Sequence, residues 1–318
     1  MDAPADLLDR RLLIVTGKGG VGKTTAAAAL AQLAADRGKR TLVCELDSKG
    51  NLSSFLECGQ TKFEPREVGP NLFAMSMDSE ESLKEYLSIQ LRLPLLVRIG
   101  PLNRIFEYVA TAAPGVREIL TIGKMAWEVR ERHWDLIVVD AVATGHIVGL
   151  LAAPQSINEL VSVGLIRQQT DWMVELLGDP ATTGLIITAT PEEMPVNETI
   201  ELQTRLKAET NVDLAAVVVN RVLPELFGRR EEELFDSLND EDRRHAMANE
   251  VGGSVDNVMT AASLAVALRR GSTAHLERLR TQLDKSIPML YVPYLFLRTH
   301  GMRATRQVAV ALSAELGY

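Results

Sequence analysis

The sequence is poor in cysteine and has no long apolar run, and each shortage excludes a class of protein. The two cysteines, Cys44 and Cys58, cannot form a four-cysteine zinc site, and a disulfide framework is implausible. Cys44 lies in an expected strand, where it is most simply a small buried hydrophobic residue. No run approaches the ~18 apolar residues of a membrane span. We therefore expect no integral membrane segment.

A surplus of positive charge is also lacking. The net charge of −8 argues against a broad basic face for a nucleic-acid backbone, so we expect no nucleic-acid partner. The acidic stretch Met1–Asp6 has no apolar core and does not resemble a signal peptide. With 46% hydrophobic residues and 13 prolines, the 318-residue chain is globular in composition and can bury a substantial core. A soluble cytoplasmic protein is expected.

What the sequence does have is a glycine-rich loop between an apolar run, Leu12–Val15, and an alanine-rich helical run, Ala26–Ala35. Strand, glycine-rich turn and helix N-terminus form the context that a phosphate-binding loop requires, because backbone N–H groups and the helix dipole favour phosphate oxygens there. A glycine-rich turn without a ligand is disfavoured by the intact pattern. The fixed positions of G-x-x-x-x-G-K-[ST] are Gly17, Gly22, Lys23 and Thr24, and the residues expected to contact nucleotide are Gly17, Lys18, Gly19, Gly20, Val21, Gly22, Lys23, Thr24 and Thr25.

Two residues of this loop have expected roles in chemistry. Lys23 is predicted to reach the β- and γ-phosphates, and the Thr24 hydroxyl to hold Mg²⁺. Lys18 is a second lysine, which the ordinary pattern does not require. Its simplest alternative role is that of a solvated loop residue.

Acidic residues end two of the expected strands. Asp47 follows the strand 41–46, and Asp140 ends the continuous apolar run D-L-I-V-V-D. Because ligands gather at the carboxyl ends of parallel strands, Asp47 is expected to meet the γ-phosphate and its attacking water. Its alternative role is an N-cap or turn residue. Asp140 is expected to hold Mg²⁺ through water, and its alternative role is a capping residue.

Strands and helices alternate along the whole chain. The pattern predicts an α/β fold of the P-loop NTPase type, with a mostly parallel, doubly wound sheet, helices on both faces and a single domain over 1–318. A helical subdomain, approximately 79–132 plus 155–178, is predicted as an insertion between strands; a surplus of exposed apolar residues there would form a client surface. Helices are expected at 80–91, 95–112, 116–132, 156–164, 165–177 and 303–316, with a charged helical region at 224–283.

Several motifs follow one another in a characteristic order, and together they resemble the ArsA family of ATPases, which includes arsenite-pump and tail-anchored-protein-targeting ATPases. The resemblance spans nearly the whole chain. It is carried by the loop 17–25 with its extra lysine, Asp47 with Asn51-Leu52-Ser53, Ala113-Pro114-Gly115, Asp140 with Thr144-Gly145-His146, Pro154, Glu198-Thr199 after Pro195, and Val219-Asn220-Arg221.

The resemblance implies ATP and Mg²⁺ as cofactors and a role for each matching residue. Asp47 would orient and polarise the hydrolytic water, and Lys18 would act on the phosphates of a partner subunit. The further roles would be sensing of the γ-phosphate by Gly145, reading of adenine by Asn220, lining of the base pocket near Pro293, and contact of Glu198 with nucleotide across the interface.

The chain also departs from the family pattern. Ala143 replaces the proline of the usual D-x-x-P-T-G-H, and neither the C-x-x-C zinc clamp nor arsenite-binding cysteines are present. There is one P-loop, where the pump ATPase has two. A methionine-rich groove for transmembrane helices is not indicated, because the two expected helical segments contain Met125 and Met173 alone.

The sequence therefore predicts a dimeric, Mg²⁺-dependent ATPase of the ArsA type that acts as a nucleotide-driven switch on a protein partner or client. The partner subunit would be a second copy or a related ATPase, and the client, or a membrane component, is not identified. The alternatives are a tail-anchored-protein chaperone with a reduced groove, a MinD- or ParA-like positioning ATPase, and a regulatory subunit of a heterodimeric ATPase.

Overall fold

The computed structural model describes residues 7–46, 51–91, 115–160, 163–225, 227–238, 240–296 and 301–318. Its centre is one eight-stranded sheet with the order β3-β4-β2-β5-β1-β6-β7-β8. The strands are β1 (Leu12–Gly17), β2 (Thr41–Glu45), β3 (Arg66–Gly69), β4 (Leu72–Ser76), β5 (Leu136–Asp140), β6 (Thr183–Ala189), β7 (Leu214–Val222) and β8 (Met289–Pro293).

All neighbouring strands run parallel except the edge pair β3 and β4, which is antiparallel. β1 lies between β5 and β6, and its register aligns Val15 with Asp140 and Gly17 with Thr188. The loop that follows β1 therefore leaves the middle of the sheet at its carboxyl edge. The mostly parallel α/β sheet predicted from the sequence is confirmed.

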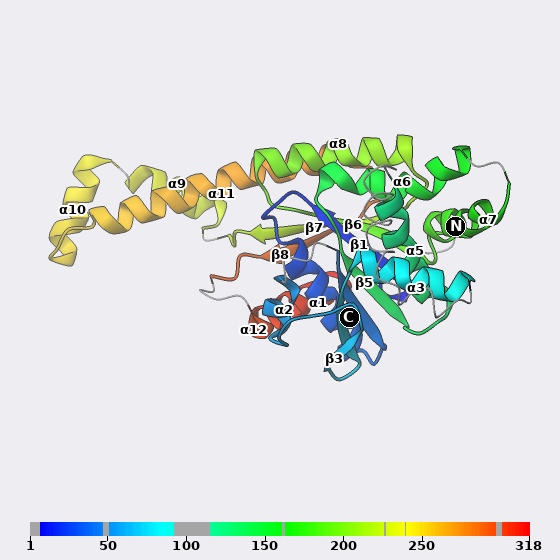
Figure 1. Cartoon of the computed structure of the whole chain (residues 1–318). Helices are drawn as coiled ribbons and strands as arrows, with labels where there is room; N and C mark the ends of the chain where they lie inside the picture. The colour runs from blue at the N-terminus through cyan, green and yellow to red at the C-terminus, as the bar shows by residue number, and fades with distance from the viewer. Residues whose placement is uncertain are drawn as a thin grey trace.

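Helices cover both faces of this sheet (Figure 1). On one face lie α1, α2 and α12, and on the other lie α5, α6 and α8. The helices are α1 (Lys23–Asp36), α2 (Asn51–Leu56), α3 (Ser79–Leu91), α5 (Val116–Arg130), α6 (Thr144–Leu160), α7 (Leu165–Gly178), α8 (Glu193–Glu209), α9 (Arg229–Leu238), α10 (Glu241–Val251), α11 (Asp256–Gln282) and α12 (Met302–Glu315), with a short 3₁₀ helix η1 (Leu7–Asp9). Within the described residues, no helix is both long and apolar enough to cross a membrane.

The strand side chains alternate between two hydrophobic cores. Leu13 and Val15 face the core that includes the alanines of α1, whereas Leu12 and Ile14 face the core that includes α5, α6 and α8. Because both faces of β1 are covered, the strand reads as a continuous apolar run. Cys44 belongs to the second core and is fully buried, and burial raises the pKa of its thiol. Its expected role as a small buried hydrophobic residue is confirmed.

The sequence-based boundaries were wrong in three places. The helix expected at 156–164 begins at Thr144 and runs through Pro154, so this proline does not begin a new element. The helix α2 and the edge strand β3 were not expected, because each is short and its polar residues were assigned to loops. The helix expected at 95–112 and Ala113-Pro114 lie outside the described residues.

A side layer of helices adjoins the sheet: α3 packs on α5, and α5 on α6 and α7. Its polar centre is Glu128. The carboxylate of Glu128 accepts hydrogen bonds from Lys124 at 2.7 Å and from Trp134 Nε1 at 3.0 Å. It also lies 2.8 Å from His133 Nδ1. Burial alone would raise the pKa of Glu128, but these hydrogen bonds outweigh burial and hold that pKa below its usual value. The boundaries of the helical subdomain stay a prediction.

We predict that Glu128→Ala lowers the free energy of unfolding at pH 7 by about 2–4 kcal/mol, because the buried Lys124 and Trp134 and the exposed His133 lose their acceptor. The carboxylate stabilises the fold above its unfolded-state pKa, and this contribution is lost as pH falls through the lower folded-state pKa. The difference from wild type should therefore shrink in acid. Urea unfolding at several pH values measures it, with the exposed Glu131→Ala as control; equal losses for both variants would contradict the prediction.

Candidate functional site

Two glycines of the loop 17–25 stand where no side chain fits. Gly17 has φ +154°, and an ideal Cβ there would collide with the carbonyl oxygen of Thr188. Gly22 has φ +99°, and its Cβ would collide with the side-chain amide of Asn220. Both backbone conformations are ones that residues with a Cβ rarely adopt. The loop is therefore held tightly between the end of β6 and the end of β7.

The N-terminus of α1 brings a hydroxyl and a carboxylate together. Thr24 Oγ1 donates a hydrogen bond to Asp140 Oδ2 at 2.7 Å, from the first turn of α1 to the end of β5. Asp140 is only 5% exposed. These hard oxygen ligands at one point fit the preferences of Mg²⁺. No cluster of three or more His, Cys, Asp or Glu side chains among the described residues could hold a metal by itself.

The two lysines of the loop point to different partners. Lys23 Nζ donates to the carbonyl oxygen of Lys18 at 3.3 Å, so its side chain curls over the loop. Lys18 Nζ forms an ion pair with Glu198 near the start of α8. The other oxygen of Glu198 accepts a hydrogen bond from Thr144 Oγ1 at 2.9 Å. Glu198 thus joins the loop to the first turn of α6.

Burial alone would raise the pKa of Glu198, but the hydrogen bonds from Lys18 and Thr144 outweigh burial and keep that pKa below its usual value. The carboxylate is therefore ionised at neutral pH, as the ion pair requires. Gly145, next to Thr144, lines a pocket with Glu198 and Arg205. The sequence-predicted residues Lys18, Gly145 and Glu198 thus lie together within one chain.

A second pocket, about 330 Å³ in volume, opens beside the loop between the ends of β7 and β8. Asn220 lies at its wall, and Asn220 Nδ2 donates to the carbonyl oxygen of Val21 at 2.8 Å. Val21 and Asn220, which are 199 positions apart in the sequence, meet here. The pocket is lined by Thr25, Asn220, Arg221, Pro293, Tyr294, Leu295, Phe296, Ala304 and Val308.

Asp47, the predicted water-positioning carboxylate, lies outside the described residues. The structure adds a neighbour that sequence reasoning missed: Glu45, at the end of β2, is buried, and its Oε1 accepts from the backbone N–H of Asn51 at 3.0 Å. Glu45 pairs in register with Asp140. The signal for it was an acidic residue in an otherwise apolar strand, two positions before Asp47. This contact connects the end of β2 to the start of α2.

Comparison with known proteins identifies the family of the chain. A profile described as anion-transporting ATPase (ArsA ATPase) matches residues 10–175 and 166–243. The chain belongs to the ArsA family of ATPases. The protein named ATPase BagA of Mycobacterium tuberculosis is 32% identical over 232 residues, which cover 70% of this chain and 68% of BagA.

More distant relatives carry other names from the same family. A putative arsenical pump-driving ATPase of Halobacterium salinarum is 28% identical over 242 residues, which cover 69% of this chain and 37% of that protein. ATPase ASNA1 homolog 1 of Paramecium tetraurelia is 28% identical over 254 residues, which cover 66% of this chain and 74% of that protein. The predicted ArsA family membership is confirmed.

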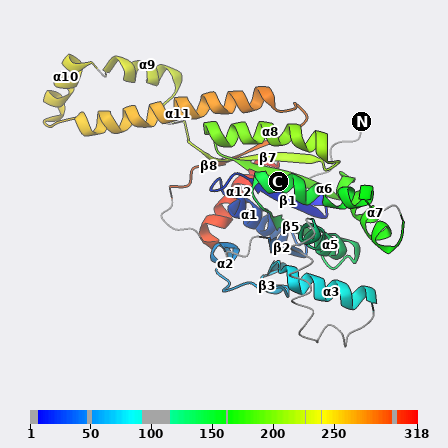
Figure 2. The same cartoon turned by 45° about the horizontal axis from the view of Figure 1, so that its top comes forward.

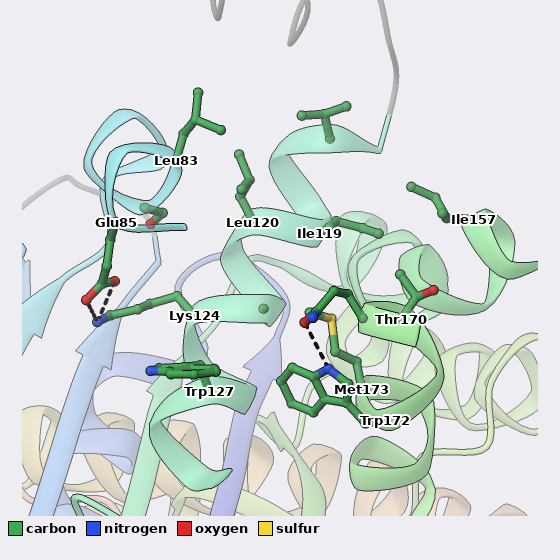
Figure 3. Close-up of a pocket in the computed structure, with 14 residues that line it drawn as sticks. Leu83, Glu85, Ile119, Leu120, Lys124, Trp127, Ile157, Thr170, Trp172 and Met173 are labelled. Atoms are coloured by element: carbon green, nitrogen blue, oxygen red, sulfur yellow. Dashed lines mark hydrogen bonds and ion pairs between the residues drawn. The ribbon is translucent and has the colours of Figure 1, made fainter. Parts of the chain in front are cut away.

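This ArsA family chain also has an apolar pocket away from the loop, in the side layer of helices (Figure 3). Its volume is about 240 Å³. Leu83 of α3, Leu120 and Trp127 of α5, Ile157 of α6 and Met173 of α7 contribute to its lining. Lys124, paired with Glu85 and Glu128, brings charge to one side of it. The pocket is an apolar recess large enough for a few side chains.

We predict that Gly22→Ala destabilises the fold by about 1–3 kcal/mol, because the new Cβ meets Asn220 and the residue must keep φ +99°. Gly19→Ala is the matched control in the same loop: no heavy atom lies within 4 Å of its ideal Cβ. The control should change stability by no more than about 0.5 kcal/mol. Thermal melts of the nucleotide-free proteins compare them, and equal effects would show that the close approach to Asn220 is unimportant.

Proposed function

We propose that the chain is a Mg²⁺-dependent ATP hydrolase that works as a dimeric, nucleotide-driven switch on a protein partner. The observation that carries this proposal is the convergence on one loop of Lys23, the Thr24–Asp140 pair, and the pocket beside Asn220. A phosphate cradle, an oxygen pair suited to Mg²⁺ and a base-sized recess are the three parts that ATP requires. Family membership supports the same reaction.

In this proposal, the backbone N–H groups of the loop and Lys23 bind the phosphates. Thr24 would hold Mg²⁺ directly and Asp140 through water, and the ion would neutralise charge on the phosphates when bound. Asp47 would hold and polarise the attacking water as a carboxylate acceptor. Each of these groups comes from the carboxyl edge of the sheet, where ligands of open α/β folds bind.

Asn220 would select the base. Its Nδ2 donates to the carbonyl oxygen of Val21 at 2.8 Å, and its Oδ1 accepts from the backbone N–H of Arg221 at 2.9 Å. The second lone pair of Oδ1 would accept a hydrogen bond from an exocyclic amine. Adenine offers such an amine, whereas guanine presents a carbonyl at the same position. Pro293 and the backbone after it would line the remainder of the recess. The proposal therefore names ATP as the substrate in preference to GTP.

The Lys18–Glu198 ion pair would belong to the open state of the switch. For Lys18 to act on the phosphates of a partner subunit, it must leave Glu198. Thr144 donates to the same carboxylate, so a movement of Glu198 away from Lys18 and Thr144 would also release the start of α6, including Gly145. Glu198 would then contact the nucleotide across the dimer interface. Partner binding and the state of the nucleotide become coupled through one carboxylate.

The apolar recess beside Trp127 favours a second, compatible role, the binding of apolar side chains of a protein client. Its volume of about 240 Å³ suits a few apolar side chains, whereas a membrane-spanning helix needs about 20 residues of groove. The reduced-groove chaperone is therefore the closest alternative. The partner would be a second copy of this chain or a related ATPase.

We predict that Asp47→Asn separates ATP binding from hydrolysis. The loop, Lys23 and the Mg²⁺ ligands are unchanged, so affinity for ATP should stay within a few-fold. The amide is a weaker acceptor for the water proton, so single-turnover hydrolysis should slow by roughly 10²–10⁴-fold. Glu64→Gln, a carboxylate-to-amide change at an exposed site, is the control. A near-normal rate with reduced thermal stability would make Asp47 a turn residue.

We predict that Lys18→Ala binds ATP but hydrolyses it poorly, because a cation that meets developing phosphate charge stabilises the transition state. If Lys18 acts in the partner subunit, mixing Lys18→Ala with Asp47→Asn protein should restore part of the activity. Both defects then fall on one site of the mixed dimer, and the other site is intact. Mixed dimers that form without recovered activity would place the action of Lys18 within its own chain.

A further inference from the structure

Three helices form an arm that leaves the body of the molecule between β7 and β8. The arm consists of α9, α10 and the first half of α11, and both views show it extending away from the sheet (Figures 1 and 2). α11 has 27 residues and is therefore about 40 Å long. Its second half lies along α8. The arm plays no part in the nucleotide site described above.

One face of α11 is covered by its own neighbours. Met259 and Val266 are buried together with Phe235 of α9 in a small core of the arm. Farther along, Leu279 is buried in the core that includes α8. Arg270 adds ion pairs to Glu232 at 3.2 Å and to Asp236 at 2.9 Å, which fix α9 to α11. The arm is thus internally packed on this face.

A different face of α11 is exposed along most of its length. Leu264 is 61% exposed and Leu268 is 54% exposed, and the residues before and after them on this face are small. The spacing of three and four residues is that of a helix–helix seam. We name this face the outer stripe; its members, all exposed, are Asn257, Thr260, Ala261, Leu264, Ala267, Leu268, Gly271, Ala274 and Arg278.

We propose that the outer stripe binds the outer stripe of a second copy of this chain, with the two α11 helices antiparallel. Pairing about a twofold axis near Ala267 and Leu268 would set Leu264 over Gly271, and Ala261 over Ala274. A large residue then meets a small one, which lets the two helices approach closely. The stripe is thus complementary to itself when one copy is reversed.

Charge favours the same orientation. Asp256 is the only charged residue of α11 before Arg269, whereas the second half carries Arg269, Arg270, Arg278 and Arg280 against Glu277. Neither Asp256 nor Arg278 forms an ion pair with another residue that the structure describes. An antiparallel partner would bring Asp256 beside Arg278 of the second copy at both ends of the seam. A parallel partner would instead stack like charges.

The size of the seam indicates how strong the pairing is. A helix about 40 Å long and about 10 Å wide offers about 400 Å² per copy, or about 800 Å² in total. Stable interfaces generally bury about 1,200–2,000 Å². The arm pairing is therefore a weak contact by itself, which adds to any other interface between the same two copies. It rests on α11 alone and not on the proposed nucleotide switch.

Cysteine crosslinking of the full, nucleotide-free chain tests the geometry. Cys58→Ser removes the partly exposed thiol, and Cys44 is buried. In that background, Leu268→Cys lies next to the twofold axis and should form a disulfide with itself on oxidation. Ala261→Cys and Ala274→Cys should each stay uncrosslinked alone and should crosslink when mixed. Self-crosslinking of Ala261→Cys would show parallel pairing, and absence of every crosslink would overturn the proposal.

Sedimentation measures the energetics. Leu264→Glu with Leu268→Glu removes four leucines from a symmetric seam and should raise the dissociation constant of nucleotide-free self-association by at least ~100-fold. The matched control is Leu234→Glu with Val258→Glu, two exposed apolar residues of the arm outside the outer stripe. Helix content by circular dichroism confirms that both proteins fold. Equal association of the two double variants would refute the seam.

The two proposals can fail independently. Stripe variants that no longer self-associate, yet still show activity recovery when Lys18→Ala and Asp47→Asn are mixed, would support both. If mixing Lys18→Ala and Asp47→Asn restores ATP hydrolysis but Leu268→Cys forms no crosslink, the arm pairing is refuted and the nucleotide switch stands. Crosslinking without any ATP hydrolysis would leave the arm pairing and refute the switch. Crosslinks to a different protein in a cell extract, with none between copies, would show that another partner occupies the stripe.

Discussion

The close approach of Gly17 to the carbonyl oxygen of Thr188 is the constraint on which the site depends. β1 lies between β5 and β6, so the chain that leaves β1 must turn in the space between two neighbouring strand ends. Only a residue without a side chain can turn there. The turn points the N-terminus of α1 at the edge of the sheet, and it sets Thr24 against Asp140 of β5. The tight turn at Gly17 is therefore a consequence of the strand order.

Much of this arrangement could be predicted from the sequence, because buried parallel strands produce continuous apolar runs. The runs at 12–15 and 136–139, and the glycine pattern between residues 17 and 22, determined the sheet centre and the loop. The pocket beside Asn220 and Pro293 was expected from the family resemblance, not from local pattern, since residues so far apart give no local signal. The start of the helix expected at 156–164 was wrong, since α6 begins at Thr144 and accommodates Pro154 in its interior, although proline interrupts most helices.

Other features could not be predicted because they depend on side-chain contacts between distant elements. Nothing local in the sequence shows that Lys18 meets Glu198, 180 residues away, or that Thr144 shares the same carboxylate. Likewise, the charged region 224–283 reads as solvated helices, and its composition does not distinguish an arm from a helix packed on the body. The exposure of Leu264 and Leu268 becomes visible only when Met259 and Val266 are seen packed on α9.

The candidate nucleotide site and α11, the long helix of the arm, both contact α8. Glu198 lies near the start of this helix, in contact with Lys18 and Thr144. Toward its other end, Gln203 accepts from the backbone N–H of Asp284 at 2.8 Å, and Lys207 pairs with Asp284 at 2.9 Å, directly after α11. Two polar contacts and a shared apolar core pack α8 against the second half of α11. We therefore expect a displacement of Glu198 that tilts α8 to tilt the arm as well, with a larger movement at the tip because α11 is long.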